Sequence, residues 1–136
     1  MTQKTTQLIL ASHGQLACAL KGTAEMIIGP QLDVMCFSLA AGADVEEFKE
    51  RIAIAVSTGQ PVLILVDMTG GTPWNVALAA SADKAWVRVV GGVNLPMLLE
   101  VAMARGTADV QQLAHIADEA GVQGIRTADV ISRLQS

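Results

Sequence analysis

A histidine and an aspartate in this sequence could together handle a phosphoryl group. His13 follows a short apolar stretch at residues 8–11, and Asp67 follows a second one at Val62–Val66. A free histidine side chain titrates near pH 6.5, so at neutral pH much of it is an uncharged nucleophile that can accept phosphate. A carboxylate that accepts a hydrogen bond from the ring Nδ1–H would leave the Nε2 lone pair facing solvent and steady charge on the ring during transfer. His13 is therefore the candidate nucleophile, and Asp67 its orienting partner.

The glycine-rich segment after the second apolar stretch offers a place for the phosphoryl oxygens. Gly70 and Gly71 can turn backbone N–H groups toward an anion, and a helix that starts at this point adds a partial positive charge. Thr72 fits the N-cap of that helix, with Pro73 at its first position, and the Thr72 hydroxyl can donate to a phosphoryl oxygen. The segment is no Walker loop, because the spacing and the lysine of GxxxxGK[ST] are missing. We predict a phosphate cradle here.

Two other residues complete the list of candidates. Gly14 directly follows His13 and would let another phosphate-bearing surface approach the ring closely. His115 lies in a helical stretch without an acidic or glycine-rich companion, so we interpret it as structural. The proposed chemistry requires no metal ion and no other cofactor.

Strands and helices alternate along the chain and must position these residues. Hydrophobic periodicity and turn residues predict strands at residues 8–11, 33–38, 62–66 and 86–90, and helices at 16–28, 45–56, 73–82, 96–105 and 110–120. This order predicts a doubly wound α/β fold with a mainly parallel sheet and helices on both faces. Residues 122–125 are interpreted as a short edge strand, and the last dozen residues are not assigned.

The predicted fold brings the candidate residues together. Ligands of such sheets lie beyond the carboxyl ends of the strands, where the winding reverses. His13, Asp67 and the glycine-rich turn all follow strand ends, although 54 positions separate His13 from Asp67. Taken alone, each has a plainer interpretation: His13 as a structural residue, Asp67 as a turn former, the turn as a helix cap and Trp74 as a core residue. Their convergence on one sheet edge favours a functional site.

The composition excludes several classes of protein. A chain of 136 residues with 51% apolar side chains can form one domain with its own core. The longest apolar runs are far shorter than the roughly 20 residues of a membrane helix, and the polar N-terminus does not resemble a secretory signal. We expect a cytoplasmic protein. A net charge of −4 without a cluster of basic residues argues against nucleic acid as a partner.

The two cysteines carry no metal or disulfide signature. Cys18 and Cys36 stand apart, without a CxxC pair or a nearby histidine, so neither a zinc site nor a disulfide framework is predicted. We interpret both as small buried apolar residues.

Three separated motifs resemble the mannose-family IIA domains of the bacterial phosphoenolpyruvate-dependent sugar phosphotransferase system. They are LILASHG at residues 8–14, VDMTGGTPWN at residues 66–75 and GGVNLPM at residues 91–97, in the order of that family. The similarity covers residues 7–125 and implies a single EIIA-type domain over residues 1–136. Family members commonly have Ser at the position of Thr72 and Phe at that of Trp74, and both replacements keep the chemistry. Met68 and Thr69 look more like the sorbose or amino-sugar branches than the mannose branch.

The resemblance implies a phosphotransferase that forms a transient phosphohistidine. His13 would receive phosphate from the phosphocarrier HPr and pass it to a IIB component that serves a IIC/IID membrane transporter. Asp67 would orient the ring, with Gly71 and Thr72 at the phosphate. Because the sequence ends at Ser136 without a linker to a IIB domain, we expect a free-standing IIA subunit. The family also suggests a homodimer whose C-terminal strand is exchanged between subunits as an antiparallel edge, with residues 122–125 as the candidate strand.

Two alternatives remain open at this point. One is the histidine phosphotransfer subunit of a dihydroxyacetone kinase, which resembles this domain but passes phosphate to a bound nucleotide. The other is a non-catalytic regulatory domain in which the glycine-rich turn binds a phosphate-bearing ligand and His13 only donates a hydrogen bond to it. A carrier must form a covalent, acid-labile phosphohistidine, whereas a binding domain needs only reversible occupancy.

Overall fold

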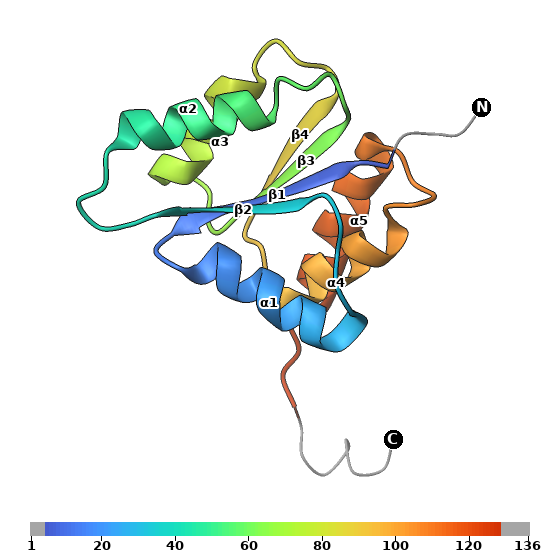
Figure 1. Ribbon diagram of the computed structural model, residues 1–136. Coiled ribbons are helices and arrows are strands. Elements are labelled where there is room, and N and C mark those ends of the chain that lie inside the picture. The colour runs from blue at the N-terminus through green and yellow to red at the C-terminus, as the bar shows by residue number, and fades with distance from the viewer. Residues whose placement is uncertain (1–4, 129–136) are drawn as a thin grey trace.

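The structure, a computed structural model, describes residues 5–128 as four strands and five helices (Figure 1). In chain order the elements are β1 (Gln7–His13), α1 (Leu16–Ile28), β2 (Val34–Leu39), α2 (Val45–Ala55), β3 (Val62–Val66), α3 (Thr72–Ser81), β4 (Val87–Gly91), α4 (Leu95–Ala104) and α5 (Val110–Gln123). The strands form one sheet in the order β2-β1-β3-β4, and every neighbouring pair is parallel. The predicted doubly wound parallel α/β fold is confirmed.

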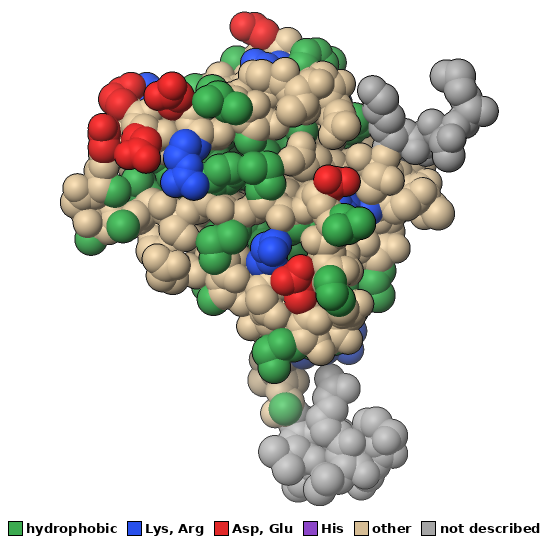
Figure 2. Space-filling model, viewed as in Figure 1, with side chains coloured by type: hydrophobic (Ala, Val, Ile, Leu, Met, Phe, Trp, Pro, Cys, Tyr) green, Lys and Arg blue, Asp and Glu red, His purple; other side chains and the backbone are tan. Residues whose placement is uncertain are grey.

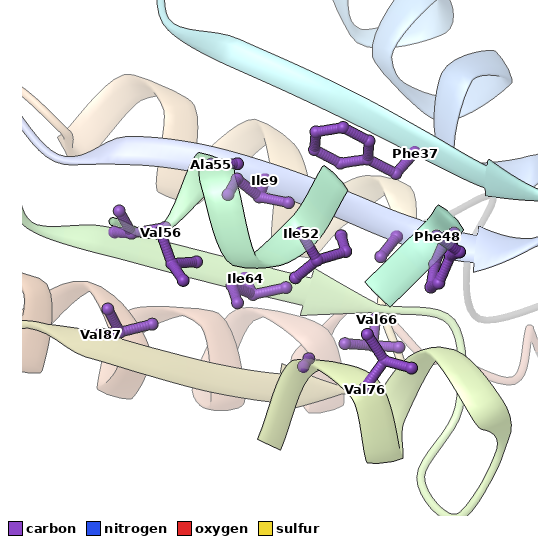
Figure 3. Packing of buried hydrophobic residues seen from close by; sticks show 13 residues of the cluster. Ile9, Phe37, Phe48, Ile52, Ala55, Val56, Ile64, Val66, Val76 and Val87 are labelled. Carbon is purple, nitrogen blue, oxygen red and sulfur yellow. The ribbon is translucent and has the colours of Figure 1, made fainter. Parts of the chain in front are cut away.

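Helices cover both faces of the sheet, and alternate side chains of each strand reach one layer or the other. On β1, Ile9 packs in the cluster under α2 and α3, whereas Leu8 and Leu10 pack in the cluster under α1, α4 and α5 (Figure 3 shows the first cluster). All residues of β3 are buried, because this inner strand has neighbours on both sides and a helix layer over each face. The two inner strands, β1 and β3, thus form a rigid support for the residues at their carboxyl ends.

Side-chain caps fix where three of the helices start. The Asp44 carboxylate accepts the N–H of Glu46 at the start of α2, and the Asn94 side chain accepts the N–H of Met97 at the start of α4. A reciprocal capping box formed with Asp109 starts α5. The Asn94 amide also donates to the carbonyl oxygen of Gly121 at 3.0 Å, which ties the start of α4 to the last turn of α5.

A buried arginine closes the other end of the sheet. Arg105 follows α4, is only 8% exposed, and donates from its guanidinium to the carbonyl oxygens of Leu32 at 2.6 Å, Asp33 at 3.2 Å and Thr6 at 3.3 Å. Burial lowers the pKa of the Arg105 side chain, and the charge of Asp33 acts in the opposite direction. The guanidinium therefore links the segments that lead into β1 and β2 to the end of α4.

The predicted edge strand at residues 122–125 is wrong. Val122 and Gln123 belong to α5, and Gly124 caps that helix by donating its N–H to the carbonyl oxygen of Ala120 at 2.9 Å. Gly121, the glycine directly after the predicted helix at residues 110–120, lies inside α5 and allows a close contact, since a Cβ there would lie 2.7 Å from Met97 Cε. Of the unassigned last dozen residues, 129–136 lie outside the described part of the chain.

The interpretation of the cysteines is also wrong. Cys18 in α1 and Cys36 in β2 are joined by a disulfide, and both are half-buried rather than buried. The packing of α1 over β2 brings their Cα atoms to 5.2 Å, well inside the range that a disulfide can span. Neither the spacing of 18 positions nor the neighbouring residues reveal this contact, because it depends on tertiary packing.

Candidate functional site

His13 and Asp67 lie side by side at the carboxyl edge of the sheet. His13 is the last residue of β1, and Asp67 immediately follows β3, which pairs with β1. One oxygen of the carboxylate, Oδ2, lies 2.8 Å from His13 Nδ1 and also accepts the backbone N–H of His13 at 3.0 Å. The His13 side chain is 48% exposed, whereas that of Asp67 is 10% exposed. The structure therefore places these two residues together at one edge of the sheet, as the sequence predicted.

The environment of Asp67 keeps it a carboxylate. Burial raises the pKa of Asp67. Hydrogen bonds from the His13 ring, from the His13 backbone N–H and from the N–H of Met68 lower it by more than burial raises it, so the pKa of Asp67 lies below its ordinary value. An ionised carboxylate can only accept, so Nδ1 of a neutral His13 must carry the hydrogen. The Nε2 atom of that tautomer has a free lone pair.

Gly71 lies against the other edge of the imidazole ring. A Cβ at this position would lie 2.7 Å from His13 Cε1 and 3.4 Å from His13 Nε2, so only a glycine leaves room for the ring as it stands. The Gly71 backbone therefore borders the ring nitrogen that faces away from Asp67.

The helix after Gly71 starts one residue earlier than predicted. Gly71 is the N-cap of α3, and Thr72 is its first residue rather than its cap. The Thr72 side chain is not needed as a cap, and it forms no hydrogen bond to any of residues 5–128. Gly70 takes a left-handed backbone conformation with φ of +83°, which turns the chain from β3 into the helix. Of the predicted cradle residues, Gly71 thus lies against the His13 ring, and Gly70 and Thr72 are its neighbours in the chain.

The turn after His13 is held by a serine that the sequence analysis did not single out. The buried Ser12 hydroxyl accepts the N–H of Ala17 at 2.8 Å, which secures the first turn of α1 although Gln15 provides no side-chain cap. Gly14 has φ of +57° and donates its N–H to the carbonyl oxygen of Leu39 at 2.8 Å. A serine three or four residues before a helix, at the end of a strand, is the local signal that could have identified this role.

A hollow of about 400 Å³ opens beside His13. Its walls are Gly14 on one side and the end of β2 with the following turn, from Leu39 to Ala43, on the other, and Val45 closes it at the start of α2. Side chains around the histidine are apolar and exposed: Leu16 is 47% exposed, Val45 40% and Met68 54%. The nucleophile therefore stands on an open, mainly apolar surface rather than in a deep pocket.

A larger groove of about 650 Å³ runs between α2 and α3 but lacks this chemistry. It is lined by four carboxylates against one cation, Lys49, together with apolar residues of α2 and α3, and Figure 2 shows the acidic side chains gathered over α2. Carboxylates repel a phosphate, and the groove has no histidine. His115, on α5, is 73% exposed and apart from the residues of the site, and its Nε2 lies 3.4 Å from Glu119 Oε1, an acidic companion that the sequence analysis did not recognise.

Within residues 5–128, no group of three or more histidine, cysteine, aspartate or glutamate side chains is placed to hold a metal ion. The helices of the same region are all too short or too polar to cross a membrane.

Comparison with known proteins matches the sequence to one family. The family model described as PTS system fructose IIA component matches residues 7–117. The PTS system mannose-specific EIIAB component of Escherichia coli strain K12 is 35% identical over 126 residues, which are 90% of this chain and 39% of that protein. The sorbose-specific EIIA component of Lacticaseibacillus casei is 34% identical over 111 residues, which are 79% of each chain.

A solved structure agrees over almost the whole chain. The mannose/sorbose specific IIA subunit of the phosphotransferase system from Enterococcus faecalis superposes with a TM-score of 0.86 at 32% identity, and the match covers 93% of this chain and 97% of that one. The chain is thus similar in length to that subunit, whereas it spans about two fifths of the Escherichia coli relative.

Proposed function

The chain belongs to the family of PTS system IIA components, and on that basis we propose that it carries a phosphoryl group on His13 during sugar uptake. The observation that supports this most directly is the hydrogen bond of 2.8 Å between His13 Nδ1 and Asp67 Oδ2. It prepares a half-exposed histidine as a nucleophile at the end of an inner strand. HPr is the proposed donor and a IIB component the proposed acceptor.

The transfer uses the two ring nitrogens of His13 differently. The Nε2 lone pair attacks the phosphorus of the donor phosphohistidine, the donor P–N bond breaks, and its electron pair returns to the donor ring. Nδ1 keeps its hydrogen throughout, and the Asp67 carboxylate balances the positive charge that develops on the imidazole of His13. The same step in reverse, with an acceptor side chain as nucleophile, unloads His13.

The phosphoryl oxygens would be held by the segment at the start of α3. The backbone of Gly71 borders Nε2, and the first N–H groups of a helix lack internal partners and can bind an anion. The Thr72 hydroxyl, which is not used as a helix cap, would donate to one oxygen, and Gly14 and Gly70 shape the turns on either side. These roles make the six residues from the sequence analysis one working site.

The open apolar surface around His13 suits a carrier better than a hydrolase. A carrier has to present its phosphohistidine to two different proteins in turn, so the nucleophile must stand where another protein surface can reach it. Exposed Leu16, Val45 and Met68 would lie against the partner and exclude water from the phosphoryl group during transfer. A homodimer, a cytoplasmic location and indirect service to a IIC/IID transporter belong to the same proposal.

The test is phosphorylation by a defined donor. The chain is incubated with phosphoenolpyruvate, enzyme I and HPr, and analysed by intact-mass and tandem mass spectrometry at mildly alkaline pH, beside His13→Ala and, as a matched control, His115→Ala. One acid-labile phosphoryl group is expected on wild type and on His115→Ala, and none on His13→Ala. An unphosphorylated, folded wild-type chain beside a working HPr would refute the carrier role and favour a reversible phosphate-binding domain.

The acceptor is tested separately. Phosphorylated protein is mixed either with a mannose-family IIB component or with the nucleotide-bound subunit of a dihydroxyacetone kinase, and loss of the phosphoryl group is followed by mass. Transfer to IIB alone is expected. Transfer to the nucleotide alone would replace the sugar-uptake role by the kinase role.

A further inference from the structure

We propose that Cys18 and Cys36 form a reversible dithiol–disulfide pair that reacts with small thiols and disulfides and controls how well partners dock at His13. The reactivity of the pair follows from its place in the fold alone. The control of docking rests on the function proposed above.

The pair joins the two elements that flank the histidine turn. Cys18 is the third residue of α1 and lies five residues after His13, while Cys36 pairs in register with Leu10 in the middle of β1. Their disulfide is half-buried on both sides, in contrast to the fully buried core around β3. A small thiolate can therefore reach the bond without unfolding of the sheet.

Contacts on both sides of the bond lead directly to the site. On the side of α1, the N–H of Ala17, the residue before Cys18, is held by the Ser12 hydroxyl at 2.8 Å. On the side of β2, the strand continues from Cys36 to Leu39, whose carbonyl oxygen accepts the N–H of Gly14 at 2.8 Å. The disulfide thus closes a ring of contacts around the turn that carries His13.

The chemistry of the pair is ordinary thiol–disulfide exchange. A thiolate of a small thiol such as glutathione attacks one sulfur, which forms a mixed disulfide and releases the other cysteine as a thiolate. A second small thiolate then attacks the mixed disulfide and releases the remaining cysteine. In sum, two small thiols are oxidised to one small disulfide, the protein disulfide gains two electrons, and the two cysteines end as thiols after taking up two protons. The oxidised small disulfide drives the reverse reaction.

Reduction acts on the docking surface and not on the ring. Two thiols cannot remain at bonding distance, so cutting the bond pushes the sulfurs apart and removes the covalent tie that holds the start of α1 against β2. Leu16 at the start of α1 and Leu39 in the wall of the hollow then lose their fixed spacing. Asp67 follows β3, on the opposite side of β1, and its hydrogen bonds to His13 stay in place. We expect the KM for phosphorylated HPr to rise about threefold to tenfold on reduction, with little change in kcat.

The first measurement traps thiols and needs no phosphorylation. The folded chain is equilibrated in glutathione buffers from fully reduced to fully oxidised, alkylated and weighed by mass spectrometry. Two alkylated cysteines at the reducing end, none at the oxidising end and the same curve from both directions are expected. Thiols that stay alkylatable in oxidised glutathione, or a bond that persists in reduced glutathione, would overturn the reversible pair.

The second measurement compares transfer kinetics in the two states. Initial rates of His13 phosphorylation are measured with oxidised and reduced wild type, and with Cys18→Ser and Cys36→Ser, which cannot form the bond. The variants should behave as reduced wild type in both buffers. Equal KM in both states of wild type, or a redox response retained by the variants, would overturn the control of docking. Absence of phosphorylation in every sample would overturn the proposed function together with this control, while the trapping curve still decides the pair itself.

Discussion

At the scale of single residues, one carboxylate oxygen accepts two hydrogen bonds from the same histidine. Asp67 Oδ2 accepts both the ring Nδ1–H and the backbone N–H of His13, so it sets the tautomer of the ring and fixes the backbone from which the ring projects. An amide oxygen in its place can accept the same two bonds, but an amide carries no charge, and its NH2 group cannot accept the Met68 N–H that Asp67 Oδ1 accepts. Replacing Asp67 with asparagine therefore tests the contribution of the charge with little change in the size and shape of the side chain.

The variant Asp67→Asn should slow phosphorylation of His13 by about 10²-fold, because the ring loses the charge that stabilises it, while the amide NH2 group opposes the Met68 N–H that now holds the side chain in place. Initial rates of phosphoryl incorporation from phosphorylated HPr measure the effect. Asp83→Asn, at an exposed position outside the site, is the matched control and should keep the wild-type rate. A wild-type rate in Asp67→Asn would show that Asp67 is only a turn former.

The same carboxylate should make stability depend on pH. The pKa of Asp67 in the folded protein lies below its ordinary value of 3.8, so between these two values the unfolded chain binds more protons. The stabilising contribution is therefore complete above pH 3.8 and is lost as pH falls through the lowered pKa. In urea unfolding, the difference in free energy of unfolding between wild type and Asp67→Asn should shrink as the pH drops below 3.8. A difference in free energy of unfolding that stays constant or grows down to about pH 2.5 would contradict the hydrogen-bonded carboxylate.

At the scale of elements, the turn between β3 and α3 places backbone against the reactive ring. Gly71 has φ of −88°, so its conformation suits any residue, and only the space around it demands glycine. This distinguishes it from Gly70, whose φ of +83° requires glycine for the backbone itself.

The variant Gly71→Ala should lower the phosphorylation rate by about 10²-fold, because the new methyl group must displace the ring from its position. Gly106→Ala is the matched control, since a Cβ there meets nothing within 4 Å, and it should retain the wild-type rate. Far-ultraviolet circular dichroism should show both variants folded. Phosphorylation of Gly71→Ala at the wild-type rate would show that the His13 ring can accept phosphate from a displaced position.

Elements with strong local signals could be predicted, and contacts that depend on tertiary packing could not. The run Val62–Val66 is uniformly apolar and branched, which identified an inner strand with the bounds that the structure shows. Alternation of strands and helices then placed His13 and Asp67 at the same edge across 54 positions. At residue 121, by contrast, glycine suggested the end of a helix, whereas the structure uses it for contact with Met97. The partner of Cys18 was missed for the same reason, because its distance is set by how α1 packs on β2.

At the scale of the whole molecule, chemistry and anchoring lie at opposite ends of the sheet. His13 stands at the carboxyl ends of the strands, and Arg105 binds the segments that enter β1 and β2 at their amino ends. The inner strands between them are buried, so a local change at one end has little room to displace the other.

The variant Arg105→Met should lower the free energy of unfolding by about 3 kcal/mol, because the carbonyl oxygens of Leu32, Asp33 and the buried Thr6 lose their charged donor. At a temperature where the variant is folded, His13 should still be phosphorylated at nearly the wild-type rate. Urea unfolding and the transfer assay measure the two effects, with Arg126→Met, whose side chain is exposed, as the control. Loss of transfer in folded Arg105→Met would show that the two ends are coupled after all.

The positions of the two tryptophans have an optical consequence. The chain has only two tryptophans, and they lie at different ends of the sheet. Trp74 is in the first turn of α3, beside the site, and its ring lies within 3.2 Å of where a Gly91 Cβ would stand. Trp86 directly precedes β4, at the amino end of that strand. Trp86→Phe would therefore leave a single native fluorophore next to the proposed phosphate cradle. Its emission could follow loading and unloading of His13 in real time, without a dye or a label.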